Sequence, residues 1–223
     1  MDMEPAGPVS SPFRAAEALR ESLAFARGLL RRPAHVGAVA PASRWLARAV
    51  ARAAAGSGCR RLIEVGAGTG ALTAVLAAQS SPDCSLVAIE SDPEFARWLR
   101  RRFPGIRVVR GCASRVCEFV EPGVPSAIVS SLPFRSMPEV DSARCSRALC
   151  DAVASSADSM LIQYIYGFGD SPPFAPASSG LRWRKAARVL LNLPPASVWI
   201  LEHAERSGDD EPPSSRPTEC PDR

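Results

Sequence analysis

The stretch from Leu62 to Gly70, which reads LIEVGAGTG, constrains the fold more than any other part of the chain. An apolar run ending at Val65 predicts a buried parallel strand, and a helical pattern begins at Ala71. Three glycines at alternate positions lie between them, where a sharp turn and the close approach of a ligand both exclude a Cβ atom. The first N–H groups of the following helix point to the same place. The pattern therefore predicts a ligand site at the first turn of an α/β fold.

A carboxylate follows the glycine turn at the distance expected of a ribose-binding residue. The next predicted strand, 86–89, runs directly into Glu90, which stands twenty residues after Gly70. A carboxylate at that place suits the two hydroxyls of a ribose. Gly66, Gly68 and Ala71 also satisfy the looser spacing of a dinucleotide site, and a tight turn without any ligand is the simplest alternative.

Residues 64–70, EVGAGTG, resemble motif I of class I S-adenosylmethionine-dependent methyltransferases. An acidic residue stands two positions before the first glycine, and the last glycine closes a GxGxG. The resemblance implies S-adenosylmethionine as cofactor, with the acidic residue orienting the loop and the cofactor amine and the glycines admitting the methionine part. The cofactor-binding residues that it implies are Glu64, Gly66, Ala67, Gly68, Gly70, Glu90, Ser91, Cys112, Ala113 and Ser130.

One position departs from that family pattern. Where the family commonly has Gly-Asp-Ala, with the Asp accepting from the adenine amine, this chain has Gly111-Cys112-Ala113. A thiol is a much weaker acceptor than a carboxylate. The adenine would therefore depend more on backbone groups and stacking.

Strand and helix patterns alternate along most of the chain. Helices are expected at 13–30, 44–55, 71–79, 93–103 and 141–155, and strands at 61–65, 86–89, 106–110, 127–131, 160–166, 183–191 and 198–201. Asp92 is the expected N-cap of the helix at 93–103, with Pro93 at its first position. We predict a Rossmann-like class I methyltransferase fold: a mostly parallel seven-stranded sheet with an antiparallel C-terminal hairpin and helices on both faces. The closing antiparallel pair favours methyltransferases over dinucleotide-binding dehydrogenases. The expected divisions are a disordered N-terminus (1–12), a helical cap (13–58), the core (59–206) and a disordered acidic tail (207–223).

Cysteine and histidine usage bears on the compartment. The seven cysteines include no CxxC pair, and the chain has only two histidines. This favours reduced thiols in a cytoplasmic protein over a disulfide framework or a metal site, and no metal is expected. The N-terminus lacks the features of a signal peptide, and no apolar run reaches the roughly 18 residues of a membrane span.

The positive charge is concentrated away from the C-terminus. Residues 207–223 carry a net charge of −3 and the rest of the chain +7. A basic body suits a phospholipid surface, RNA or an acidic metabolite, or is only a solvated surface. The predicted helix at 13–30 is amphipathic, and residues 13–32 have a net charge of +3. Such a helix either lies in an anionic membrane interface or packs on the domain through its apolar face.

The turn Ser130-Ser131-Leu132-Pro133-Phe134 follows a predicted strand, at the edge of the sheet where ligands bind in open α/β folds. It resembles the (Asn/Asp/Ser)-x-Pro-(aromatic) motif IV of amine methyltransferases, although an ordinary turn is the plainer interpretation. The resemblance implies that Ser130 and the Leu132 carbonyl hold the target amine. Pro133 would fix the turn, and Phe134 would offer an aromatic face to a cationic amine.

Further side chains are candidates for substrate contact. Tyr164 and Tyr166 would meet the amine or a headgroup phosphate, unless they are core residues. The basic residues of 182–185 would meet lipid phosphates or form a solvated strand face. The loop 168–180 is long enough to be a lid or an inert excursion.

Segments from 25 to 199, including VGAVAPAS at 36–43 and NLPPASVW at 192–199, together resemble the bacterial phospholipid N-methyltransferase family. That resemblance implies methylation of the phosphatidylethanolamine amine at an anionic membrane surface, by a cytoplasmic protein bound peripherally to the inner face of the membrane. Two alternatives stay open. A nucleic-acid adenine N-methyltransferase would usually carry a basic C-terminal domain, whereas this C-terminus is short and acidic. A non-catalytic S-adenosylmethionine-binding protein would fit Cys112.

Overall fold

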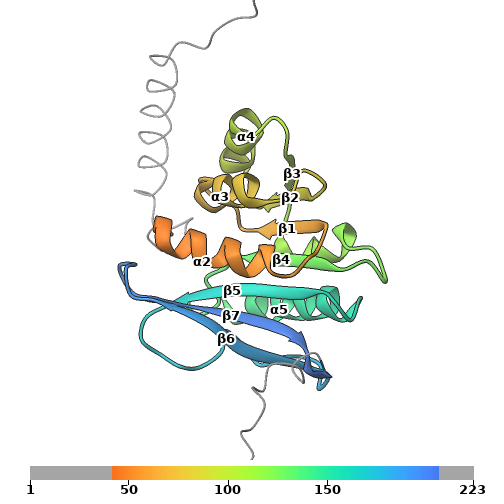
Figure 1. The fold of residues 1–223 in the computed structure, drawn as a ribbon, viewed down its shortest axis with the longest axis vertical. Coiled ribbons are helices and arrows are strands. Elements are labelled where there is room, and N and C mark those ends of the chain that lie inside the picture. The colour runs from red at the N-terminus through yellow and green to blue at the C-terminus, as the bar shows by residue number, and fades with distance from the viewer. Residues whose placement is uncertain (1–41, 206–223) are drawn as a thin grey trace, which may run out of the picture. The chain divides into compact units, whose positions relative to one another are not determined.

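The computed structural model describes residues 42–205 of the chain. They form a seven-stranded sheet with the strand order β3-β2-β1-β4-β5-β7-β6 (Figure 1). The predicted helix at 13–30, the N-terminal segment 1–12 and the tail 207–223 lie outside the described residues.

The sheet is parallel except for its last two strands. The parallel strands are β1 (Arg61–Val65), β2 (Ser85–Glu90), β3 (Arg107–Arg110), β4 (Ser126–Ser130) and β5 (Met160–Tyr166). The final strands are β6 (Leu181–Val189) and β7 (Ala196–His203), and β7 runs antiparallel to both β5 and β6. Because strands that are buried on both faces need continuous apolar runs, β1 and β4 are readable from sequence. The predicted fold class is confirmed.

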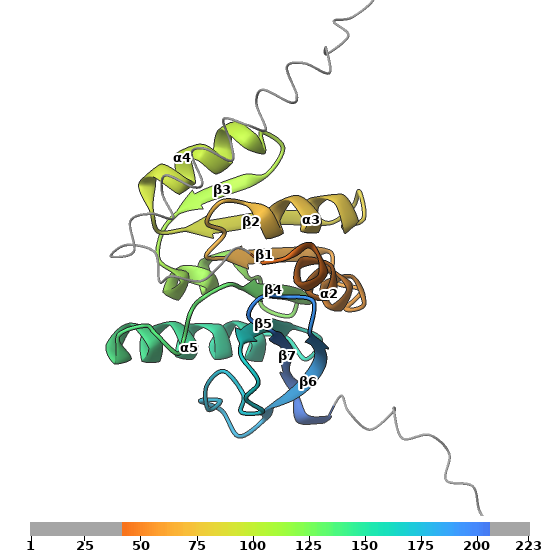
Figure 2. The same cartoon turned by 90° about the vertical axis from the view of Figure 1, so that its left-hand side faces the viewer.

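Helices cover both faces of this sheet. The α-helices are α2 (Arg44–Ala55), α3 (Ala71–Gln79), α4 (Pro93–Arg102) and α5 (Glu139–Ala154), and a short 3-10 helix, η1, spans Ala113–Phe119. Figures 1 and 2 show α2 and α5 on opposite faces. The predicted cap of α4 is confirmed, because the Asp92 carboxylate accepts from the N–H groups of Glu94 and Phe95. The sequence did not predict η1, whose tighter turn does not follow the 3.6-residue period.

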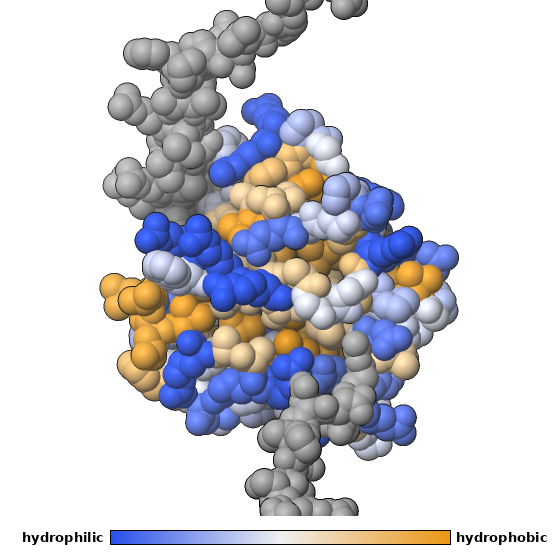
Figure 3. All heavy atoms as spheres, viewed as in Figure 1, coloured by the Kyte–Doolittle hydropathy of each residue, from blue (hydrophilic) through white to orange (hydrophobic). Residues whose placement is uncertain are grey.

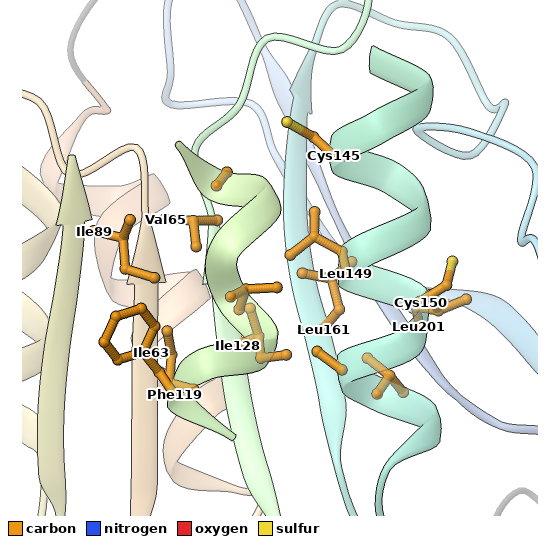
Figure 4. Packing of buried hydrophobic residues seen from close by; sticks show 14 of the residues in the cluster. Ile63, Val65, Ile89, Phe119, Ile128, Cys145, Leu149, Cys150, Leu161 and Leu201 are labelled. Atoms are coloured by element: carbon orange, nitrogen blue, oxygen red, sulfur yellow. The ribbon is translucent and has the colours of Figure 1, made fainter. Parts of the chain in front are cut away.

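Alternation along β1 divides its side chains between two hydrophobic clusters. Ile63 and Val65 pack with η1 and α5, while Leu62 belongs to the cluster under α2 and α3. Figure 4 shows the first cluster, where Leu149 of α5 lies against Leu161 of β5. By the same alternation Glu64 faces the side of α2 and α3, one residue before the end of a strand that is otherwise apolar after Arg61.

Helix α2 packs on the sheet, although the sequence grouped it with an N-terminal cap. Its buried face, which includes Leu46 and Val50, joins a cluster with Val129 and Ile162 from the middle of the sheet. Because its apolar residues recur at helical spacing, this helix has a face of its own that packs on the sheet.

The carboxyl ends of the parallel strands meet at one edge of the sheet, which we call the carboxyl edge. Val65 pairs with Ile89 and Ser130 in the neighbouring strands, and Tyr166 at the end of β5 pairs with Ala196 at the start of β7. The turn between β6 and β7 therefore lies at this edge too. Among the described residues, no helix has both the length and the apolar character needed to cross a bilayer.

Candidate cofactor and substrate site

The glycine turn after β1 is shaped by three positive φ angles. Gly66, Gly68 and Gly70 have φ values of 75°, 53° and 77°, a region that favours glycine. The Gly66 N–H donates to the Ile89 carbonyl at 2.9 Å, which ties the turn to β2. A Cβ atom on Gly68 would come no closer to a described neighbour than 4.0 Å, to the Gly66 oxygen. The turn thus keeps an open side at Gly68, as close approach of a ligand requires.

Glu90 holds this turn from the neighbouring strand. Its Oε2 accepts from the Gly68 N–H at 2.7 Å, and its Oε1 accepts from the Asp92 N–H at 2.8 Å. The Ser91 hydroxyl, on an exposed residue, donates to Oε1 at 3.4 Å. A carboxylate oxygen has two acceptor sites, so Glu90 retains capacity for a hydroxyl pair such as that of a ribose. Ala67, the other predicted residue of the turn, is buried against α4.

Glu64 is the least satisfied polar group near the turn. Its side chain is fully buried, and among residues 42–205 neither carboxyl oxygen has a hydrogen-bond partner. Burial raises the pKa of Glu64 to about 8; the nearby Thr73 hydroxyl offsets part of this shift, and the charge of Glu90 adds to it. Thr73 does not reach hydrogen-bond geometry, since its own hydroxyl is unpartnered within the described chain. A buried carboxyl without a partner fits a cationic group such as the amine of S-adenosylmethionine.

Cys112 occupies the position where an adenine-binding Asp was expected. Its Sγ lies 4.0 Å from the Cys145 Sγ, and it accepts from the Arg144 Nη2 at 3.7 Å. Burial raises the pKa of this thiol, but contacts with Ser114 and Cys145 and the Arg144 charge outweigh burial and leave the pKa lowered. Ala113, also predicted at the site, begins η1 and is buried. The thiol therefore already interacts with α5.

The turn after β4 lies against the glycine turn. The Ser131 N–H donates to the Val65 carbonyl at 3.0 Å, and a Cβ atom on Gly66 would meet the Leu132 Cδ2 at 3.3 Å. The Ser130 hydroxyl is buried and accepts from the Leu132 N–H at 3.3 Å. The motif I and motif IV turns, which are more than sixty residues apart in sequence, thus form one surface.

Two predicted substrate contacts in this turn are engaged within the chain. The Leu132 carbonyl accepts from the Phe134 N–H at 3.0 Å and from the Gln163 Nε2 at 3.1 Å, which uses both of its acceptor sites. The Phe134 ring is buried, with its centroid 4.7 Å from that of Phe174. Together with Pro133, these groups hold the shape of the turn, and their predicted contacts with an amine stay predictions.

Tyr164 and Tyr166 lie on the face of β5 that carries α2, the face to which Glu64 also points. Their ring centroids are 5.5 Å apart in an edge-on arrangement. Burial raises the pKa of Tyr164, which hydrogen bonds with Ser131 and Tyr166 partly offset, and burial likewise raises the pKa of Tyr166. Both phenols therefore stay protonated at neutral pH and act as neutral hydrogen-bonding groups.

Ser131 joins these two phenols in what we call the hydroxyl cluster. The residue predicted to hold the amine is its neighbour Ser130, and that role stays a prediction. β4 ends at Ser130, one residue earlier than predicted, so Ser131 leaves the strand on the side of Tyr164. The spacing polar-x-Pro-aromatic, counted back from Pro133, already leads to Ser131. That count was the available signal.

The basic strand face predicted for lipid phosphates is largely paired within the chain. Arg184 Nε lies 2.6 Å from the Glu202 Oε1, and Lys185 forms an ion pair with Asp170. In the long loop 168–180, the Phe174 carbonyl accepts from the Trp183 Nε1 at 2.9 Å. The middle of this loop is thus fixed on β6, and its predicted role as a lid stays a prediction.

A cavity lies elsewhere, at the amino ends of the strands. Its volume is about 470 Å³, and Cys59, Arg60 and Cys84 contribute to its walls. None of the predicted site residues lines it. The crevice chemistry of an open α/β sheet belongs to the opposite, carboxyl edge.

No family model matches the chain. Over 110 residues it is 37% identical to an ornithine lipid N-methyltransferase of Singulisphaera acidiphila; the match covers 47% of this chain and 57% of that relative. The chain thus matches little more than half the length of this relative.

Solved structures resemble the chain over a longer span. A TehB-like S-adenosylmethionine-dependent methyltransferase from Corynebacterium glutamicum has a TM-score of 0.54 at 18% identity, over 82% of this chain and 98% of that one. The mitomycin 7-O-methyltransferase MmcR has a TM-score of 0.51 at 18% identity, over 87% and 69%. The fold is that of the class I S-adenosylmethionine-dependent methyltransferases. In this methyltransferase fold, the glycine turn, Glu64 and Glu90 stand at the first two strand ends of the carboxyl edge.

Proposed function

We propose that the protein is an S-adenosylmethionine-dependent N-methyltransferase that methylates the amine headgroup of a membrane lipid such as phosphatidylethanolamine. The observation that carries the proposal is the buried carboxyl of Glu64, which has no hydrogen-bond partner among the described residues, beside an open glycine turn on a methyltransferase fold. The lipid substrate class is supported by the relative that is an ornithine lipid N-methyltransferase. Both lipids present an alkyl amine.

The residues around the glycine turn would bind the cofactor. Bound S-adenosylmethionine supplies a methyl group on a sulfonium centre, which is already a good leaving group. Glu64 would neutralise the cofactor amine, and Glu90 would accept from the ribose hydroxyls while it holds the Gly68 N–H. The proposed adenine position at Cys112 offers only a weak acceptor.

The hydroxyl cluster of Ser131, Tyr164 and Tyr166 would bind the substrate amine. An alkylammonium has an ordinary pKa near that of lysine, about 10.4, so the amine must release a proton to water before it attacks. Burial in the site disfavours the charged ammonium and lowers its pKa. The neutral hydroxyl oxygens can then accept from the amine N–H groups and align its lone pair. Ser130, Leu132, Pro133 and Phe134 would keep the turn in position.

The proposed place of action is the inner membrane surface, where the protein would bind peripherally. A lipid substrate has to present its headgroup to the carboxyl edge, because the glycine and motif IV turns both lie there. The observations give no comparable support to a nucleic-acid substrate, which becomes an outcome of the test.

The deciding experiment measures methyl transfer from radiolabelled S-adenosylmethionine by the full chain. Vesicles containing phosphatidylethanolamine, vesicles containing ornithine lipid, and rRNA are offered in parallel. Label in a lipid fraction is expected, and a Glu90→Ala variant should lose it together with cofactor binding. Label in RNA would overturn the lipid substrate, and cofactor binding without transfer to any amine would overturn the enzymatic proposal.

A further inference from the structure

Large hydrophobic side chains that are exposed to solvent gather at a single edge of the sheet. Within residues 42–205 they are Trp45, Val140, Phe168, Leu190, Leu191 and Leu193. Every one belongs to a turn or helix start at the carboxyl edge: the first turns of α2 and α5, the end of β5 and the β6–β7 turn. Exposed apolar residues are ordinary when scattered, but a concentration on one side marks an interaction surface.

The β6–β7 turn presents most of this apolar surface. Leu190, Leu191 and Leu193 are 66%, 68% and 88% exposed, whereas Asn192 between them is only 4% exposed. The turn thus directs its polar side chain inward and its leucines outward, the reverse of an ordinary surface turn. Figure 3 shows an apolar patch on this side of the molecule, with hydrophilic side chains beside it.

Hydrogen bonds fix the turn to its neighbours. The Asn192 Oδ1 accepts from the Ser43 N–H at 2.9 Å, and its Nδ2 donates to the Pro194 carbonyl at 2.6 Å. The Gly167 N–H donates to the Pro195 carbonyl at 2.6 Å. These bonds join the turn to the start of α2 and to the end of β5. Trp45, Phe168 and the three leucines therefore stand on segments that these bonds hold together, and we call these five residues the apolar rim.

Basic residues flank the apolar rim. The guanidinium groups of Arg44 and Arg48 lie 4.7 Å and 5.9 Å from the centroid of the Trp45 ring. Arg188 donates to the Phe168 carbonyl at 3.1 Å, and Arg135 donates to the Tyr166 carbonyl at 3.5 Å. Asp170 offsets part of this charge, but Lys185 as well as Arg188 pairs with it. Val140 stands apart from the rim, between Glu139 and Asp141.

This combination fits the surface of an anionic bilayer. A protein interface needs roughly 20–30 residues on each side, far more than the rim provides. A bilayer interface needs only apolar side chains that enter the headgroup boundary and basic side chains that meet anionic lipid. Arginine and tryptophan are both suited to that boundary, because each combines an apolar body with a polar end.

We propose that the apolar rim inserts into an anionic membrane and holds the carboxyl edge against it. Tyr166 ends β5 two residues before Phe168 of the rim, so the amine of a lipid would reach the hydroxyl cluster while its acyl chains stay in the bilayer. This proposal rests on the proposed lipid substrate for its purpose, but its central claim is a binding surface.

The test measures binding of the full chain to vesicles of phosphatidylcholine alone or mixed with phosphatidylglycerol. Leu193→Asn should weaken binding to the mixed vesicles roughly tenfold, because a leucine side chain loses its apolar burial, and substitution of all three leucines by Asn should abolish it. Val140→Asn is the matched control, since that side chain is similarly exposed at the same edge but has acidic neighbours. Arg188→Gln should reduce the preference for anionic vesicles, whereas Arg60→Gln at the opposite edge should not.

Activity separates this proposal from the proposed function. The triple Leu→Asn variant should keep the wild-type kcat/KM on a short-chain lipid that stays monomeric in solution, and lose turnover on vesicles. Unchanged vesicle binding by that variant would overturn the membrane rim, as would a wild-type dimer that dissociates on the same substitutions. If the wild-type chain methylates no lipid yet binds vesicles through the leucines, the proposed function fails and the rim stands.

Discussion

Glu64 is the residue at which folding and cofactor binding oppose each other most directly. The fold buries its carboxyl without a partner among the described residues and raises its pKa to about 8, mainly through desolvation. The folded protein therefore keeps a proton that the unfolded chain releases near 4.5, the ordinary pKa. Between these two values the unfolded state binds fewer protons, so the contribution of Glu64 to stability falls as the pH rises.

The variant Glu64→Gln should therefore be more stable than the wild type without ligand, and increasingly so from pH 5 to pH 8. Thermal unfolding over that range measures the difference. The same variant should bind S-adenosylmethionine more weakly, by roughly tenfold or more, because a charge-assisted hydrogen bond is lost. A difference in Tm that does not change with pH would show that Glu64 is ionised in the folded protein.

Tyr164 is the central residue of the hydroxyl cluster, since it contacts both Ser131 and Tyr166. Tyr164→Phe should lower kcat for methyl transfer to an amine lipid by roughly tenfold to a hundredfold, the usual range for a lost positioning contact. Cofactor affinity, measured by calorimetry, should stay unchanged, because Glu64 and the glycine turn are intact. Equal losses in cofactor affinity and in kcat would mean that the hydroxyl supports the fold instead of the amine.

At the scale of elements, packing against α4 and the residue that follows it explains why the last residue of the turn is glycine. A Cβ atom on Gly70 would lie 2.6 Å from the Phe103 ring and 2.8 Å from Leu99, and its φ is 77°. Gly123 has the same φ, but no atom of residues 42–205 outside its chain neighbours lies within 4 Å of such a Cβ. Gly123→Ala should cost about 1–2 kcal/mol from its backbone conformation, and Gly70→Ala a further 1–3 kcal/mol, roughly, from overpacking. Urea unfolding of the two variants tests this, and equal losses would contradict the packing role.

The elements of the sheet were predictable where their pattern was continuous, and less so at the carboxyl edge. β1 was predicted to the residue, because its apolar run and glycine turn leave no other start or end. β6 was extended to Leu191, although it ends at Val189. A leucine in the sequence predicts a strand or a buried position. Here the hydrogen bonds of the buried Asn192 side chain turn the neighbouring leucines outward. That outcome depends on contacts with α2 and with the turn's own backbone, which periodicity does not contain.

At the scale of the whole molecule, the fold brings motif I, the end of β2 and motif IV to one edge, and sequence motifs alone could predict that meeting. They could not predict which atoms remain available there. The Leu132 carbonyl is saturated by Phe134 and Gln163, and Gln163 stands on β5, thirty-one residues away in sequence. Which of Ser130 and Ser131 lies outside the strand likewise follows from where β4 ends.

Cofactor binding should stabilise the molecule as a whole, because the unfolded chain has no glycine turn or paired carboxylates to bind it. The demethylated product S-adenosylhomocysteine, at a concentration one hundred times its Kd, should add about 2.7 kcal/mol of stability. For a domain of this size that corresponds to a rise in Tm of roughly 5–10 °C.

NAD, offered at the same concentration, should give no rise in Tm, although Gly66, Gly68 and Ala71 satisfy the looser dinucleotide spacing. Glu90→Ala should remove the response to S-adenosylhomocysteine, since Glu90 both holds the Gly68 N–H and faces the proposed ribose position. A rise in Tm with NAD alone would mean that the glycine turn binds a dinucleotide instead, because the Glu90 carboxylate could accept from the ribose of either ligand.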